Sequence, residues 1–191
     1  MDTDGLTFAC ATTAEERVAK RAGLTAARVG VRVANGVPNG RLVSFGLAGA
    51  LRDGLSIGEV LDATRVVDEQ GATLWEGTPL GVPGARGGTV LGSDVLVHDA
   101  AERRRLHDAS GADAVDMESG VLARSGRLAG VVRVISDDVT SAIEGVDTTM
   151  HPDGRTDPLG LLRWLGAKRV NGVRSVFGAI VALRALEKAV A

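Results

Sequence analysis

Short apolar segments alternate with amphipathic, helix-like segments along most of this chain, and this alternation constrains the fold more than any other feature. Residues 130–135 form an almost continuous apolar run, typical of a strand buried on both faces of a parallel sheet. Strands that alternate with helices through short connections predict a three-layer α/β/α sandwich with a mixed, largely parallel central sheet. We expect strands at 6–11, 26–33, 42–45, 58–67, 89–97, 112–116 and 130–135, and helices at 14–22, 99–110, 117–125, 158–168 and 173–189.

Length and composition indicate one domain over residues 1–191, with C-terminal helices at 158–190 packed on it. The net charge of -2 and the scattered basic residues argue against a nucleic-acid partner. The single cysteine, Cys10, excludes an intrachain disulfide and fits a reducing compartment. Neither a signal peptide nor an apolar run long enough to span a bilayer is apparent, so we expect a cytoplasmic protein.

Two carboxylates are expected just after strands, where ligands of open α/β sheets bind. Glu118 follows the expected strand 112–116, and Asp137 follows 130–135. A carboxylate can accept two hydrogen bonds from a sugar diol, and a partly buried carboxyl group can act as a general acid near neutral pH. The pair suits an enzyme that holds a sugar with one acid and protonates a base with the other. The plainer alternatives are a helix cap for Asp137 and an acid favoured by the helix dipole for Glu118.

Three strings carry a family resemblance: S-F-G-L-A-G-A-L at 44–51, V-D-M-E-S at 115–119 and R-V-I-S-D at 133–137. In this order they resemble the nucleoside phosphorylase and nucleosidase superfamily. The resemblance implies that Asp137 protonates N7 of a purine, that Glu118 binds the ribose hydroxyls, and that Met117 packs under the sugar. It also implies contacts with the base or its surroundings for Phe45, Gly46, Leu96, Val97 and Ser136. For Leu96, a buried position in a strand is an equal alternative.

The expected nucleophile site departs from that of the family's hydrolases. In the nucleosidases that split methylthioadenosine, the last glutamate of an N-terminal run activates water, and Arg17 occupies that place here. Arginine cannot act as a base at neutral pH, but it binds phosphate well. The segment R-V-G at 28–30 resembles the phosphorylase segment R-V-G-S, with Val31 in place of the serine. The candidate phosphate ligands are therefore Arg17, Arg28 and Gly30, unless the arginines only form surface ion pairs.

The segment M-H-P-D-G-R-T-D at 150–157 narrows the resemblance to the hopanoid-associated phosphorylase branch, in which His151 is commonly an arginine. That branch is assigned to removing adenine from adenosylhopane, so the resemblance implies a purine nucleoside with an apolar, lipid-linked 5′ substituent. The apolar residues of 173–190 recur with helical periodicity. Such a helix could line an apolar channel or touch a membrane surface, or it could pack on the core or on another subunit.

The sequence thus favours a purine (adenine-type) nucleoside phosphorylase with inorganic phosphate as co-substrate and no cofactor. No metal is expected, because no cluster of histidine, cysteine and carboxylate residues has ligand spacing. One alternative is a hydrolytic nucleosidase in which Glu15 or Glu16 positions water. The other is a catalytically silent nucleoside-binding protein that keeps the sugar clamp. The resemblance also implies a homo-oligomer.

Overall fold

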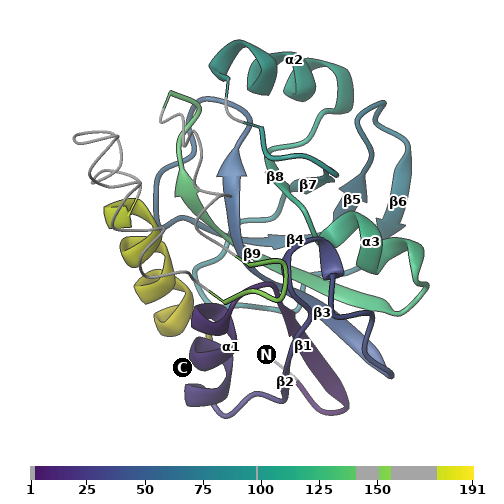
Figure 1. The fold of residues 1–191 in the computed structure, drawn as a ribbon. Coiled ribbons are helices and arrows are strands. Elements are labelled where there is room, and N and C mark those ends of the chain that lie inside the picture. Colours follow the sequence, from purple (N-terminus) through teal and green to yellow (C-terminus); the bar gives the residue numbers. More distant parts are fainter. Residues whose placement is uncertain (1–2, 98, 141–150, 156–175) are drawn as a thin grey trace.

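The computed structural model describes residues 3–97, 99–140, 151–155 and 176–191, which form a mixed sheet flanked by helices (Figure 1). The strands are β1 (Leu6–Cys10), β2 (Ala26–Arg28), β3 (Arg41–Ala50), β4 (Val60–Ala63), β5 (Arg65–Val67), β6 (Thr73–Glu76), β7 (Thr89–Gly92), β8 (Ala114–Asp116) and β9 (Leu128–Asp137). The helices are α1 (Thr13–Arg21), α2 (Ala100–Ser110), α3 (Ser119–Arg124), the 3-10 turn η1 (Val31–Val33) and the C-terminal helix over residues 176–190. The expected fold class is confirmed.

Strand β3 lies at the centre of the sheet, whose order is β2-β1-β3-β8-β7-β5-β6. One edge of β3 pairs with parallel β1 as far as Phe45 and with antiparallel β8 from Gly49 onward. The other edge pairs with parallel β9, which in turn pairs with β4. Between Phe45 and Gly49 the first edge therefore has no strand partner among the described residues. The backbone groups of Leu47 on that edge are left to bind side chains.

The strand expected at 42–45 is longer than predicted, because the glycine-rich segment after Phe45 continues β3 as far as Ala50. Here the glycines make room for side chains instead of reversing the chain. A Cβ added to Gly46 would overlap Glu15 Oε1, and one added to Gly49 would lie 2.9 Å from Asp137 Oδ2. The same stretch of strand therefore admits one acidic side chain near each of its two glycines.

Other strands are shorter than the sequence predicts, each for a local reason. The expected strand 26–33 ends at Arg28, because Gly30 adopts a positive φ of 76° and the chain continues as η1. The expected strand 89–97 ends at Gly92, whose backbone lies against Gly120 of α3 so closely that a Cβ would overlap it. The expected strand 58–67 is divided into β4 and β5. Strand β6 lies outside the strands expected above.

Helix α1 and the C-terminal helix lie side by side over one part of the sheet (Figure 1). Val18, Ala182 and Leu186 join the core beneath them, where the rings of Phe8 and Phe45 meet edge to face at 5.4 Å. The described part of the expected helix 173–189 therefore packs on the core, and the expected helix 158–168 lies outside the described residues. Among the described residues, no helix is long and apolar enough to cross a membrane.

Candidate active site

The unpaired edge of β3 is occupied by two buried side chains of opposite charge. Glu15 Oε1 accepts a hydrogen bond from the Leu47 N–H at 2.9 Å, and Arg133 Nη1 donates one to the Leu47 carbonyl at 3.2 Å. The two residues are only 3% and 1% exposed. A carboxylate and a guanidinium thus take the positions that a neighbouring strand would fill.

The start of α1 holds Glu15 in this position. Thr12 is the N-cap, and the Glu15 carboxylate accepts hydrogen bonds from the Thr12 N–H and hydroxyl at 2.7 and 2.9 Å through Oε2. The Thr12 hydroxyl in turn lies 3.3 Å from the Glu15 N–H, which completes a capping box. The cap uses Oε2 and directs Oε1 towards β3. The sequence T-x-x-E at 12–15 is the local signal that marks this glutamate.

Arg133 also forms ion pairs with two buried acidic residues, Asp116 and Glu118. Its Nε lies 2.5 Å from Asp116 Oδ2, its Nη2 lies 3.6 Å from Glu118 Oε2, and Nη2 also donates to the Ser44 hydroxyl at 2.5 Å. Asp116 also accepts a hydrogen bond from the Ser119 N–H at 2.9 Å, so it orients the start of α3. Arg133 is not among the site residues expected from the sequence, although it lies within the string R-V-I-S-D at 133–137.

Glu118 is buried beside Arg133, in a position from which its carboxylate could bind a diol. Its Oε1 accepts a hydrogen bond from the Arg32 N–H of η1 at 3.1 Å. Burial raises the pKa of Glu118 to about 8, with Arg133 opposing the rise and the neighbouring acids Asp116 and Glu15 adding to it. Because a carboxylate offers several lone pairs, these contacts leave acceptor capacity for a further ligand.

Asp137 is buried at the end of β9, next to a different arginine. Its Oδ2 lies 2.5 Å from Arg103 Nη2 of α2, and its Oδ1 accepts a hydrogen bond from the Ser136 hydroxyl at 2.7 Å. Burial raises the pKa of Asp137 above its ordinary range, against the lowering effect of Arg103. The carboxyl group therefore has the environment that a general acid near neutral pH needs.

The register of β3 and β9 sets the spacing between the two ends of the site. Arg133, which holds Glu118, lies opposite Gly46, and Asp137 lies opposite Gly49. Three residues of extended strand correspond to about 10 Å. Arg133, which lies beside the sugar-binding candidate, and the acid candidate Asp137 therefore lie along the same pair of strands, about 10 Å apart at the backbone.

The remaining candidates for base and sugar contacts differ in their surroundings. The Phe45 ring packs on Phe8, and the Val97 side chain lies in a second core cluster, so the structure places both in the hydrophobic core. Met117 and Leu96 are partly buried. The core positions of Phe45 and Val97 give no support to base contacts through their side chains.

The candidate phosphate residues are already bonded or point to solvent. Arg28 Nη1 donates to the Thr13 hydroxyl at 2.8 Å and lies 3.9 Å from Glu16 Oε2. Arg17 is exposed, whereas Glu15, two positions earlier on α1, is buried. Residues two apart on a helix do not share a face. Arg17 thus lies on a different face of α1 from the buried Glu15, and its assignment to the phosphate site stays a prediction.

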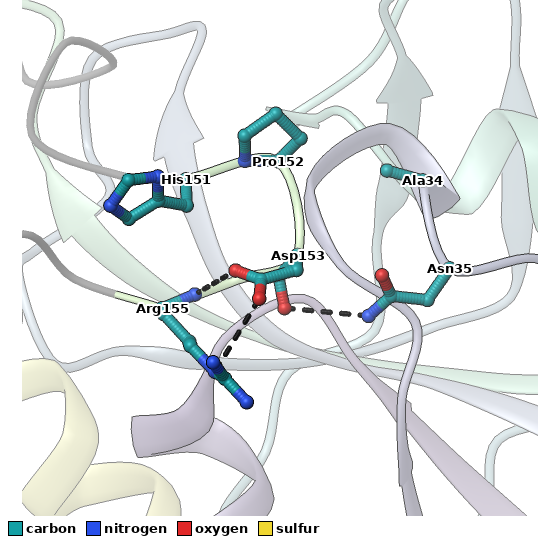
Figure 2. Close-up of a pocket in the computed structure, with 6 residues that line it drawn as sticks. All are labelled: Ala34, Asn35, His151, Pro152, Asp153 and Arg155. Carbon is teal, nitrogen blue, oxygen red and sulfur yellow. Dashed lines mark hydrogen bonds and ion pairs between the residues drawn. The ribbon is translucent and has the colours of Figure 1, made fainter.

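Residues 151–155 form a tight turn that packs on the start of α1 and on η1, and the turn lines a pocket of ≈ 420 Å³ (Figure 2). The Thr13 N–H donates to the Gly154 carbonyl at 3.1 Å, and the Val31 N–H donates to the Pro152 carbonyl at 2.9 Å. A Cβ on Gly30 would lie 2.6 Å from the Pro152 oxygen. Gly30 therefore has a packing role against the turn. The pocket is lined by Ala34, Asn35, His151, Pro152, Asp153 and Arg155.

No group of three or more histidine, cysteine, aspartate or glutamate side chains within the described ranges could hold a metal ion. The described residues of the site present carboxyl, guanidinium and hydroxyl groups. These groups can bind a diol, donate a proton and orient water.

Comparison with solved structures reveals the same fold in nucleosidases. One is a mutant of the nucleosidase MTAN from Helicobacter pylori with 5′-methylthioadenosine in its active site. The match covers 87% of this chain and 100% of the Helicobacter pylori chain, with 17% identity and a TM-score of 0.56. The 5′-methylthioadenosine/S-adenosyl homocysteine nucleosidase (MTAN) of Campylobacter jejuni matches 96% and 99% with 16% identity and a TM-score of 0.56. Futalosine hydrolase from Helicobacter pylori matches 93% and 97% with 15% identity and a TM-score of 0.54.

No protein-family model and no curated protein matches the sequence. At 15–17% identity, the structural matches show the fold and leave the activity to be argued from the site. The chain has the mixed α/β fold of these nucleosidases.

Proposed function

We propose that this protein hydrolyses the N-glycosidic bond of a purine nucleoside. The observation that carries the proposal is the buried carboxylate of Glu15 on the open edge of β3. This carboxylate lies in the same cluster of buried charged side chains as Glu118 and Arg133. It contributes to the raised pKa of Glu118, and both Glu15 and Arg133 would be in close contact with a Cβ on Gly46. The names of the solved structures that share the fold, nucleosidase and hydrolase, also favour hydrolysis.

Each carboxyl group then has one task in the reaction. Glu118 binds the ribose hydroxyls, and in its ionised form it stabilises positive charge as it develops on the sugar. The bond between C1′ and the base breaks with its electron pair on the base, while Asp137 gives its proton to N7 of the purine. Water adds to C1′, and Glu15 accepts the proton that this water loses. The products are the free base and the free sugar.

The surroundings of the candidate phosphate residues favour water over phosphate. The backbone donors of Thr13 and Val31 are bonded to carbonyls of the 151–155 turn, and Arg28 is bonded to Thr13 near Glu16. A phosphate dianion would also be repelled by the nearby buried Glu15. Phosphorolysis, which the sequence favours, keeps one observation in its support: among the described residues, the buried Nε of Arg28 has no hydrogen-bond partner.

We further propose an apolar 5′ substituent on the substrate, such as the hopanoid of adenosylhopane. Phe177 and Ile180 on the C-terminal helix are 66% and 43% exposed. Between them, Gly178 lies so close to the Ser136 carbonyl that a Cβ would overlap it, so this helix runs beside the end of β9 that carries Asp137. The helix that carries these two exposed apolar side chains thus runs beside the site, and the side chains could contact a lipid-linked group or the lipid surface that holds it.

The test is release of free base from a panel of adenosine derivatives, including one with an apolar 5′ group, with and without inorganic phosphate. Release without phosphate, with the free sugar as the product and its 5′ group unchanged, supports hydrolysis. Release that requires phosphate and yields a sugar 1-phosphate overturns hydrolysis in favour of phosphorolysis. Adenine nucleoside binding without any turnover would instead indicate a silent binding protein.

A further inference from the structure

Arg103 is a buried arginine of α2 whose guanidinium connects three chain segments around Asp137. Its Nε and Nη2 both donate to the Val97 carbonyl, at 3.0 and 2.9 Å. Its Nη1 donates to the carbonyls of Asp138 at 2.9 Å and Ala50 at 3.4 Å. Val97 lies in the segment after β7, Asp138 directly follows β9, and Ala50 is the last residue of β3. The guanidinium is thereby fixed in one orientation before any ligand binds.

In that orientation Arg103 Nη2 lies 2.5 Å from Asp137 Oδ2, and the two side chains are only 3% and 7% exposed. Gly49 makes the approach possible, because an added Cβ would lie 2.9 Å from Asp137 Oδ2 and 3.2 Å from Arg103 Nη2. An arginine keeps its charge at any pH at which the protein is folded. Little water is present to screen the pair, so the interaction is stronger than that of a surface ion pair.

We propose that Arg103 is a positioning residue that holds Asp137 and stabilises the carboxylate left behind when Asp137 protonates the departing base. This inference rests on the proposed function. In the step concerned, the O–H bond of Asp137 breaks as the N7–H bond forms, and the negative charge stays on the carboxylate that faces Arg103. The leaving base takes the electron pair of the glycosidic bond, so charge and protons balance.

The charges around Asp137 explain why this pair would matter. Among the described residues, the charged groups that act on it are Arg103 of α2 and its chain neighbour Asp138, and Ser136 contributes a hydrogen bond. Burial and Asp138 raise the pKa of Asp137, while Arg103 and the Ser136 hydroxyl lower it. A carboxyl group that was only buried would hold its proton too firmly to donate it well. Arg103 would thus keep a buried acid able to release its proton.

The experiment compares Arg103→Gln with Arg103→Lys, using the pH profile of kcat/KM for base release. Loss of the positive charge in Arg103→Gln should move the alkaline limb to higher pH and lower kcat by about 10²-fold. Arg103→Lys keeps a charge, so its limb should stay near that of the wild type. The matched control is Arg52→Gln. Arg52 forms a partly buried ion pair with Asp113, in which Nε lies 2.6 Å from Oδ1, and it is not among the groups that shift the pKa of Asp137. The control profile should not move.

A readout without turnover separates this inference from the proposed function. Carbon-13 NMR of aspartate-labelled protein, with the Asp137 signal assigned through Asp137→Asn, reports the titration of that carboxyl group directly. If no nucleoside loses its base, the proposed function fails, but Arg103→Gln must still move the Asp137 titration to higher pH. An unchanged titration and an unchanged pH profile in a folded Arg103→Gln protein would overturn the inference and leave Arg103 as a structural tie.

A second variant covers the case in which Arg103→Gln does not fold. Gly49→Ala places a methyl group between the two side chains and keeps the arginine with its carbonyl partners. Separation of the pair should move the Asp137 titration in the same direction as loss of the charge, to higher pH. A folded Gly49→Ala protein with a wild-type titration would count against the inference.

Discussion

The carboxylate of Glu15 accepts a hydrogen bond from the Leu47 N–H at 2.9 Å, across 32 residues of sequence, and so replaces a strand carbonyl at the edge of β3. Because the pairing of β3 with β1 stops at Phe45 and its pairing with β8 starts at Gly49, this edge is open beside Glu15 and Arg133. The interruption in strand pairing is what allows an acidic side chain to enter the sheet. The same interruption exposes the Leu47 carbonyl to Arg133.

Replacement of Glu15 by glutamine tests its role with water. Glu15→Gln keeps the shape of the capping box, in which glutamine is also favoured, but glutamine cannot accept a proton. We expect kcat to fall by about 10²-fold or more, with some loss of thermal stability because the amide nitrogen of glutamine cannot replace the second accepting oxygen of Glu15. The control is Glu16→Gln on the same helix, where the carboxylate pairs with Lys20 at 2.6 Å and little change in kcat is expected. Equal effects of the two substitutions would show that Glu15 is not the base.

Asp137→Asn removes the proton donor and keeps the size of the side chain. Turnover should fall by about 100-fold or more, the usual scale for the loss of a general acid, in steady-state assays of base release. Circular dichroism should show that the fold is intact. Normal turnover in this variant would mean that the base leaves without help from Asp137.

The buried carboxyl group of Glu118 should make stability depend on pH. Its pKa is raised to about 8 by burial, so between the ordinary carboxyl range and about 8 the folded protein holds a proton that the unfolded chain has lost. The free energy of unfolding must therefore fall as the pH rises through this window. Glu118→Gln removes this contribution. The unfolding free energy of the variant, relative to that of the wild type, should therefore rise by more than about 1 kcal/mol between pH 5 and pH 8.

Urea denaturation at the two pH values measures this difference, and other titrating groups cancel because both proteins contain them. The control is Glu76→Gln on the exposed edge strand β6, which should not change with pH relative to the wild type. A constant difference between Glu118→Gln and the wild type would show that Glu118 does not hold a proton in the folded state.

Docking of the 151–155 turn should depend on Gly154. This glycine has a φ of 81°, and an added Cβ would overlap the Ala11 carbonyl. Gly84 has a φ of 71° with nothing within 4 Å, so Gly84→Ala reports the backbone strain alone. We expect Gly154→Ala to cost about 1–3 kcal/mol more than Gly84→Ala in unfolding free energy, because the turn must move. Equal costs would show that the turn is not firmly held against α1.

Much of the architecture can be read from short segments of the chain. The T-x-x-E signal at 12–15 marks the start of α1, and the apolar run at 130–135 marks β9. The strings around Glu118 and Asp137 place both acids at strand ends, and in the structure Glu118 follows β8 and Asp137 is the last residue of β9. These features are local, because capping and strand burial depend on residues a few positions apart.

The tertiary structure decided which of these residues meet. The glycines at 46 and 49 are typical of a turn, yet the pairing of β3 with β9 keeps this segment extended. Arg103 joins Asp137 from 34 residues away, and nothing near either residue in the chain predicts it. The order of strands around β3 depends on burial summed over the whole sheet, so the open edge that admits Glu15, and the pairing of each acid with its own arginine, could not be read from the sequence alone.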